Sequence, residues 1–168
     1  EILTLNLQTM EYGARVKPKF ATLETAKPIE DLKTRIKALS AGTDKAGEFY
    51  RQFHYSLFSY ISHRIPEISD EVYRVDDAMM AGFGWEIGAF ETWDVLGVAK
   101  VAEAMKAAGY KVAAWIDEML ASGANSFYKV ENGKRLYYDV PTTSYKPMPG
   151  GEAFLVLNHH ADKTVWKN

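Results

Sequence analysis

The sequence predicts a mainly helical domain with a small β-hairpin near its C-terminal end. Apolar residues recur at spacings of three and four over most of residues 29–120, which is the helical period. The spacing changes to two at 126–130 and 134–140, and the Asn132-Gly133 pair between them favours a tight hairpin turn. With 168 residues, 47% of them hydrophobic, the chain can bury a sizeable core as one domain.

Composition excludes several classes of function. The net charge of −2 gives no reason to expect a nucleic-acid partner. No apolar run approaches the ~18 residues that a membrane span needs, so we expect none. The absence of cysteine removes disulfides, thiolate metal sites and a cysteine nucleophile, and it fits a cytoplasmic location. Glu1 is neither an initiator Met nor part of an export signal, so we expect a piece of a longer protein.

Two amphipathic segments follow the first twenty residues. The first predicted helix runs from Pro28 to Gly42, because proline suits a first turn and glycine a C-terminal stop. Thr43 or Asp44 can cap the second. Its apolar residues cover more than one face, so we expect it to be central and buried. They are Ala46, Phe49, Tyr50, Phe53, Leu57, Phe58 and Ile61.

A third helix and two shorter ones follow. The third is predicted from the spacing of Ile68, Val72, Val75 and Met79. We expect it to end at Gly82, and the two shorter helices to end at Gly109 and Gly123. Residues 141–151 contain three prolines and two glycines, which predicts a segment leading out of the domain.

The glycines of GFGWEIG (82–88) raise the question of a dinucleotide site. Such a site has G-x-G-x-x-G after a buried strand, whereas here the spacing is G-x-G-x-x-x-G, Glu86 lies inside it, and helical spacing precedes it. We therefore expect no NAD there. Gly82 should stop a helix, Gly84 should sit in a tight turn, and Gly88 should break the chain before a short helix containing Phe90 and Trp93. Valine at Gly82 or Gly88 should then strain the backbone and destabilise the fold.

The stretch VDDAMMAGFGWEIGAFETWDVLGV (75–98) resembles the C-terminal-domain motif of the 3-hydroxyacyl-CoA dehydrogenases, roughly [ILV]-D-x-A-M-x-x-G-F-x-x-x-x-G-P-F-x-x-x-D-x-x-G. The matching positions are Asp76, Ala78, Met79, Gly82, Phe83, Gly88, Phe90, Asp94 and Gly97. Ala89 replaces the proline of the motif, which removes a rigid first turn and keeps the break. The resemblance covers most of residues 1–148, including DKAGEFY (44–50), SFYK (126–129) and YYDV (137–140). Trp85 and Trp93 are similar to long bacterial members that also carry an enoyl-CoA hydratase part.

The resemblance implies a role in an NAD-dependent (S)-3-hydroxyacyl-CoA dehydrogenase of fatty-acid β-oxidation. In that family a His–Glu pair in an N-terminal Rossmann domain takes the hydroxyl proton while hydride passes to NAD. The helical C-terminal domain, often duplicated, closes the acyl-CoA cleft or forms subunit contacts. No stretch here looks like the Rossmann half, so we expect no catalytic, cofactor-binding or metal-binding residue in this chain. We expect it to be inactive alone, with the Rossmann domain and a sister helical domain of the same polypeptide as partners, and a dimer as an option.

We expect structural roles for the motif residues. These are Asp76, Gly82, Phe83, Gly88, Phe90, Asp94 and Gly97. Asp94 is the best general acid or base among the carboxylates, but catalysis needs two groups that face one cleft. We favour a role in which it caps a helix or bonds backbone N–H groups in the glycine turns. Glu86 is either a surface acid or a contact to a partner domain.

The domain boundaries are predicted from composition and from a loose similarity between two segments of the sequence. LNLQTMEY (5–12) aligns loosely with YDVPTTSY (138–145), so the opening strand can be the last strand of a preceding copy. We assign 1–16 to that copy, 17–43 to a linker and connecting helix, 44–148 to the helical domain, and 149–168 to a linker toward a following domain.

The spacing of the four histidines does not fit a metal-binding site. His54 and His63 are nine residues apart on one predicted helix, about 900° at about 100° per residue, so they face opposite sides. We expect His54 to be partly buried and hydrogen-bonded, and His63 to lie at the helix end. His159 and His160 are adjacent, and neighbouring side chains project apart.

Two surface features leave other functions open. Tyr55 and Phe58 lie off the main apolar stripe, so we hypothesise that this face docks on the sister domain. Basic residues could meet CoA phosphates or be a solvated face. They include Lys17, Lys19, Arg35 and Lys37. The alternatives are a helical scaffold or assembly module without acyl-CoA chemistry, or a stand-alone acyl-CoA-binding domain.

Overall fold

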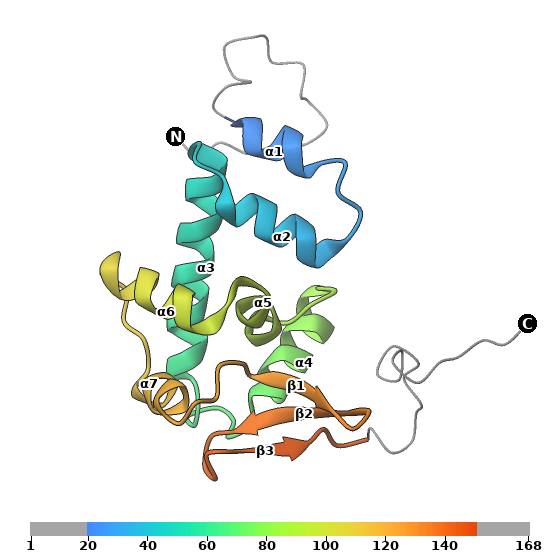
Figure 1. Cartoon of the computed structure of the whole chain (residues 1–168), viewed down its shortest axis with the longest axis vertical. Helices are drawn as coiled ribbons and strands as arrows, with labels where there is room; N and C mark the ends of the chain where they lie inside the picture. Colours follow the sequence, from blue (N-terminus) through green and yellow to red (C-terminus); the bar gives the residue numbers. More distant parts are fainter. Residues whose placement is uncertain (1–19, 151–168) are drawn as a thin grey trace, which may run out of the picture. The chain divides into compact units, whose positions relative to one another are not determined.

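The computed structural model describes residues 20–150 (Figure 1). The chain divides into two compact units between His54 and Tyr55. The division falls inside helix α3 (Lys45–His63), and each unit is described by itself. The opening strand predicted near Leu3, the basic residues Lys17 and Lys19, and His159-His160 lie outside the described residues.

The first unit contains α1 (Ala21–Ala26), α2 (Leu32–Ala41) and the first part of α3. Helix α1 was not expected, because this stretch reads as a connection between prolines. The predicted start of α2 at Pro28 is wrong: Asp31 precedes the helix and its carboxylate accepts a hydrogen bond of 2.7 Å from the Thr34 N–H. An aspartate at this position satisfies a first-turn donor that a proline cannot. The stop at Gly42 is confirmed.

Helix α3 begins after Asp44, whose carboxylate accepts a hydrogen bond of 3.0 Å from the Gly47 N–H. Of the two caps considered, Asp44 therefore fills the position. The expectation of a buried helix holds at Phe58, which is fully buried, and fails at Phe49 and Phe53, which are 58% and 44% exposed. A helix with apolar residues on several faces buries only those faces that meet a neighbour.

The helices of the second unit are α4 (Val72–Phe83), α5 (Ala89–Leu96), α6 (Val98–Ala107) and α7 (Ala114–Ala121). The short helix containing Phe90 is confirmed, and so are the stops at Gly109 and Gly123, which have φ of 84° and 89°. The predicted stop of α4 at Gly82 is wrong. The helix continues to Phe83, and Gly84 takes the left-handed conformation at φ 66° that ends it.

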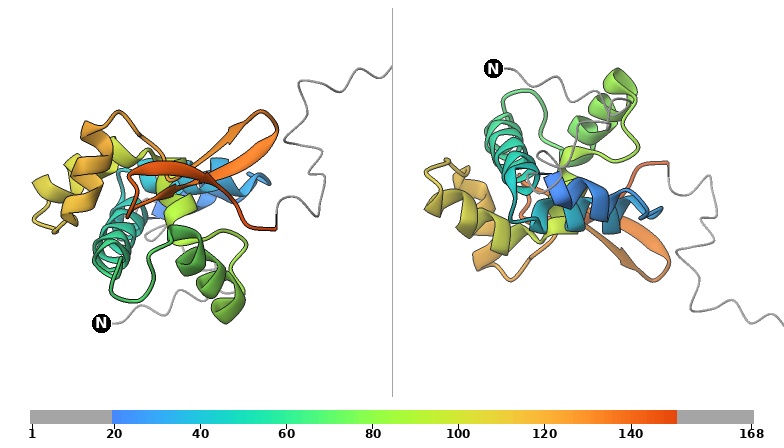
Figure 2. Two further views of the ribbon diagram at one scale, coloured as in Figure 1. Left: turned by 90° about the horizontal axis from the view of Figure 1, so that it is seen from below. Right: turned by 90° about the horizontal axis from the view of Figure 1, so that it is seen from above.

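A three-stranded antiparallel sheet in the order β1-β2-β3 follows the helices. Strands β1 (Tyr128–Glu131) and β2 (Lys134–Asp139) form the predicted hairpin, and both turn residues, Asn132 and Gly133, have positive φ. The hairpin tip lies at the opposite end of the unit from α6 and α7 (Figures 1 and 2).

The prediction that residues 141–151 lead out of the domain is wrong over part of that segment. Residues Ser144–Pro147 form β3, which pairs with β2 in the register Tyr138↔Tyr145. Proline is tolerated here because β3 is an edge strand. The next residue, Met148, donates its N–H to the Arg135 carbonyl at 2.9 Å, so the nitrogen of Pro147 lies on the side away from β2.

Aromatic side chains fill the core of the second unit. Phe58 stacks on Trp93 with ring centroids 4.8 Å apart, and Trp93 meets Phe127 edge to face. The hypothesis that Tyr55 and Phe58 form a docking face is wrong, because Phe58 is internal and Tyr55 packs on Tyr110 at 5.7 Å. Within residues 20–150, no helix is both long and apolar enough to cross a membrane.

Candidate functional site

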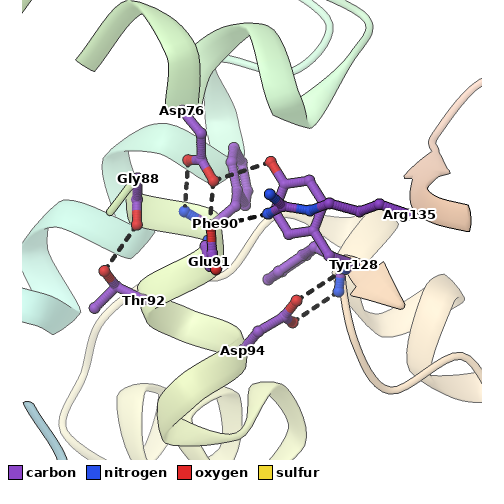
Figure 3. Close-up of polar contacts among 9 residues, drawn as sticks. Asp76, Gly88, Phe90, Glu91, Thr92, Asp94, Tyr128 and Arg135 are labelled. Carbon is purple, nitrogen blue, oxygen red and sulfur yellow. Dashed lines mark hydrogen bonds and ion pairs between the residues drawn. The ribbon is translucent and has the colours of Figure 1, made fainter. Parts of the chain in front are cut away.

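Four of the motif residues lie where α4, α5 and the start of β1 converge, namely Asp76, Gly88, Phe90 and Asp94 (Figure 3). Asp76 on α4 is 3% exposed, and its two carboxylate oxygens accept hydrogen bonds of 2.8 and 2.9 Å from the N–H groups of Phe90 and Glu91. Gly88, the residue before α5, has no side chain to supply such an acceptor. A carboxylate from another helix therefore satisfies the first turn of α5 and favours its positive dipole end.

Gly88 is required by the close approach of Asp76. A Cβ atom at Gly88 would lie 2.2 Å from Cγ of Asp76, which is far inside van der Waals contact. Its φ of −75° is open to any residue, so the expected backbone strain is not the reason for glycine here. The carbonyl of Gly88 also accepts a bond of 2.7 Å from the Thr92 hydroxyl. The break before α5 is confirmed, and its cause is space.

Asp94 on α5 connects the helices to the sheet. Its carboxylate accepts hydrogen bonds of 2.7 and 2.8 Å from the N–H groups of Phe127 and Tyr128. Asp94 was expected to bind backbone N–H groups, and it does. The expected location of these groups in the glycine turns is wrong, because they belong to Phe127 and Tyr128. The partners lie more than thirty positions away along the chain, a distance that local sequence reasoning does not reach.

Tyr128 and Arg135 complete the arrangement and were not singled out from the sequence. The Tyr128 hydroxyl donates a hydrogen bond of 2.9 Å to Asp76, and the Arg135 guanidinium lies 4.7 Å from the centre of the Tyr128 ring. Arg135 also pairs with Glu91 at 2.9 Å. The one sequence signal for these residues is the SFYK stretch, which contains Tyr128 and belongs to the resemblance.

Burial controls the electrostatics of these acids. It raises the pKa of Asp76 to about 6, although hydrogen bonds from Phe90 and Glu91 act in the opposite direction. It raises the pKa of Asp94 to about 7, and the negative charges of Asp76 and Glu91 add to that increase. The pKa of Tyr128 is also raised by burial and by Asp76. Removing charged groups from water favours their neutral forms.

The other motif residues have different environments. Gly82 faces open space, so a side chain there meets nothing within 4 Å, and the strain expected for Gly82→Val has no structural basis. Phe83 is 71% exposed, with its ring 5.9 Å from that of Trp85. Gly97 has φ 92° and joins α5 to α6.

The expected histidine roles are confirmed. His54 is 7% exposed and its Nδ1 lies 3.2 Å from the Ser40 hydroxyl. Burial lowers its pKa to about 4. His63 is the last residue of α3 and bonds the Ser59 carbonyl at 2.7 Å.

The structure describes the surroundings of two charged residues considered from the sequence, Arg35 and Glu86. Arg35 bonds the Ile29 carbonyl through Nε at 2.6 Å, which ties its guanidinium to its own unit. Glu86 is exposed, as either of its proposed roles requires.

This arrangement is suited to holding elements together. Both aspartates direct their oxygens at backbone N–H groups, so each of the four carboxylate oxygens accepts a hydrogen bond within the fold. Asp76 joins α4 to α5, Asp94 joins α5 to β1, and Tyr128 is bonded to both. The assignment of no catalytic or cofactor-binding residue stays a prediction.

The chain is 39% identical over 138 residues to a Bacillus subtilis (strain 168) protein described as a probable 3-hydroxyacyl-CoA dehydrogenase. The chain is a relative of part of that dehydrogenase. The match covers 82% of this chain, which confirms the resemblance seen in the motif. It covers only 18% of the dehydrogenase, so the chain spans less than a fifth of its relative's length. No family model matches the chain, and no solved structure matches it.

Proposed function

We propose that this chain is a C-terminal helical part of an NAD-dependent (S)-3-hydroxyacyl-CoA dehydrogenase of fatty-acid β-oxidation. The single observation that carries the proposal is the identity to a probable dehydrogenase of this name over 82% of the chain. In this proposal NAD and the reacting carbon of the acyl-CoA bind mainly to the rest of the polypeptide. The helical part shapes the acyl-CoA cleft or holds domains and subunits together. The whole enzyme acts in the cytoplasm, which the cysteine-free composition favours.

The proposed domain order has this chain as a second, duplicated helical copy. Residues 1–16 end the preceding copy, 17–43 connect, 44–148 form the helical domain, and 149–168 lead to a following domain. That following domain is an enoyl-CoA hydratase in the long bacterial type, so the enzyme is multifunctional. The relative, more than five times longer than the matched region, leaves room for such parts.

The aromatic end of α4 supports a contact with another domain. Phe83 is 71% exposed and lies beside Trp85, whereas the neighbouring motif residue Phe90 is fully buried. Covering an aromatic ring removes apolar surface from water at about 25 cal/mol per Å². We propose that the Rossmann domain or the sister helical domain covers this end, in place of the Tyr55–Phe58 face considered from the sequence.

The test compares the 168-residue chain with the complete polypeptide from the same reading frame. Both are assayed for NAD reduction with a 3-hydroxyacyl-CoA. The complete protein should turn over, and the chain alone should not exceed a blank without enzyme. An inactive complete protein would contradict the dehydrogenase proposal, and turnover by the chain alone would contradict the division of roles.

Calorimetry with a long-chain acyl-CoA tests the competing assignment as a binding domain. The proposal predicts no tight binding by the isolated chain. A Kd below about 10 μM, near −7 kcal/mol, would instead favour a stand-alone acyl-CoA-binding domain.

A further inference from the structure

The turn between β1 and β2 is an Asn132-Gly133 pair at the tip of the hairpin. Asn132 is exposed to solvent and Gly133 is partly exposed. Within residues 20–150, neither the side-chain amide of Asn132 nor the N–H of Gly133 has a hydrogen-bond partner. Both groups are therefore accessible to water and to each other.

An asparagine followed by glycine can react with its own backbone, which is one source of the thermal lability of asparagine. The nitrogen of the following residue attacks Cγ of the asparagine side chain. An N–C bond forms, the bond from Cγ to the amide nitrogen breaks, and ammonia leaves with the proton of the attacking nitrogen. Water then opens the five-membered imide at one of its two carbonyl groups and gives aspartate or isoaspartate. Glycine has no side chain that would shield the attacking nitrogen.

The closed turn keeps the two reacting atoms apart. Asn132 and Gly133 have φ of 52° and 74°, which defines the type I′ turn that two-residue hairpins favour. In this turn the first central residue has ψ of about 30°, which directs the next nitrogen away from its side chain. The Gly133 nitrogen therefore reaches Cγ of Asn132 only when the turn opens.

Opening the tip costs little, because little covers it. Val130 is 52% exposed, and the pair Glu131↔Lys134 that closes the turn is exposed on both strands. The ion pair between Lys129 and Glu131, at 2.8 Å, is exposed as well and stabilises the tip only weakly. Exposed ends of this kind open at a free energy near zero, whereas core strands open only with the whole fold.

The other end of the hairpin is firmly attached. The Tyr128 N–H is bonded to Asp94 at 2.8 Å, and the Tyr138 N–H donates a bond of 2.7 Å to the Phe127 carbonyl. Tyr137 and Tyr138 are 5% and 2% exposed. Opening can therefore be confined to the tip while the rest of the sheet stays in place.

We propose that Asn132 is a site of spontaneous deamidation that reacts through opening of the hairpin tip, and that the isoaspartate product keeps the tip open. Isoaspartate continues the chain through its side-chain carbon, which adds a methylene group to the backbone. A two-residue turn does not accommodate the added group, so the pair Glu131↔Lys134 is lost. The dehydrogenase assignment is not needed for this site.

The test is incubation of the 168-residue chain at mildly alkaline pH, followed by tryptic peptide mapping. Cleavage after Lys129 and Lys134 isolates Asn132 in one short peptide, in which chromatography and mass spectrometry distinguish asparagine, aspartate and isoaspartate. Conversion should give mainly isoaspartate and should accelerate in proportion to hydroxide, because the attacking nitrogen has to lose its proton. In urea the rate should rise several-fold, because the turn no longer restrains that nitrogen.

The chain offers two controls. Asn125 is also exposed, but it precedes Ser126, which has a side chain and whose carbonyl accepts a bond of 2.6 Å from the Tyr145 hydroxyl, so it should convert several-fold more slowly. Gly133→Ala places a methyl group beside the attacking nitrogen and should slow the conversion of Asn132 several-fold, although alanine strains this turn. Conversion of Asn132 no faster than that of Asn125, no slowing by Gly133→Ala, or equal rates in the folded chain and in urea would each overturn the proposal.

Hydrogen exchange tests the effect of the product. The isoaspartate form carries one more negative charge, so ion exchange separates it. Its amide protection should fall several-fold at Leu136, which pairs with Lys129, and stay unchanged at Tyr138. Asn132→Asp carries the same charge without the added backbone group and should keep the protection at both positions. Unchanged protection of Leu136 in the isoaspartate form, or an equal loss in Asn132→Asp, would contradict the proposed effect on the tip.

Discussion

The hydroxyl group of Tyr128 donates a hydrogen bond of 2.9 Å to Oδ2 of Asp76, across 52 positions of the sequence. The same carboxylate oxygen accepts the N–H of Glu91, so one atom ties β1 to the first turn of α5. A buried carboxylate that loses a donor keeps its desolvation penalty without the compensating bond.

Replacing Tyr128 by phenylalanine should therefore destabilise the chain by about 1–3 kcal/mol, because the ring stays and only the hydroxyl is lost. Chemical denaturation measures this difference. Tyr60→Phe is the matched control, since Tyr60 is 60% exposed, and it should change the free energy of unfolding by less than about 0.5 kcal/mol. Equal effects of the two substitutions would show that the Tyr128 hydroxyl contributes nothing particular.

The two motif glycines should respond in opposite directions to alanine. Gly88→Ala places a Cβ atom 2.2 Å from Cγ of Asp76 and should cost about 1–3 kcal/mol through forced displacement of α4 or α5. Gly82→Ala lies in α4 with open space around it and should raise stability by up to about 1 kcal/mol, because alanine favours helix. Thermal unfolding of both variants gives the sign directly, and a stabilised Gly88→Ala would mean that α4 and α5 are further apart than described.

Phe58→Ala should be far more damaging than the truncation of an exposed aromatic ring. Phe58 is fully buried and stacked on Trp93, so its loss leaves a cavity and should cost about 3–5 kcal/mol. Phe83→Ala removes the same atoms from a ring that is 71% exposed, and less than about 1 kcal/mol should be lost. Urea unfolding followed by tryptophan fluorescence distinguishes the two, and comparable losses would contradict the assignment of Phe58 to the core.

His54 should make the first unit sensitive to acid. Burial lowers its pKa from 6.5 to about 4, so the folded unit holds a neutral imidazole that an unfolded chain would protonate. Its contribution to stability is therefore complete above about pH 6.5 and is lost as the pH falls toward 4. Amide exchange in α2, which contains the Ser40 partner, should show falling protection over this range. His54→Gln should flatten the profile, and an unchanged profile would assign the acid sensitivity to other groups.

Local sequence signals were sufficient for most elements of the fold. The hairpin followed from Asn132-Gly133, and the stops of α6 and α7 from Gly109 and Gly123, because these depend on backbone conformations that few residues adopt. Local signals failed for α1, for the start of α2 and for β3. Prolines in or near α1 and β3 led to the prediction of loops there. A short helix or an edge strand can nevertheless tolerate a proline at its end, and the sequence alone does not reveal where this happens.

Within the site, residue types could be predicted and their partners could not. The motif indicated Asp76, Gly88 and Asp94 as structural residues, and all three have structural contacts. Their hydrogen bonds reach Phe90, Phe127 and Tyr128, which lie 14 to 52 positions away, and no periodic pattern encodes such distances.

The sequence by itself determined that this chain is mainly helical, that a tight turn joins two strands near its end, and that it resembles a dehydrogenase part. These properties depend on side-chain periodicity and on residues with special backbone freedom, both of which act locally. Only the tertiary structure decided why Gly88 is glycine, which donors Asp94 holds, and which aromatic rings face water. Those answers depend on the approach of segments far apart in the chain, where packing and burial set both the available space and the charge state of each carboxyl group.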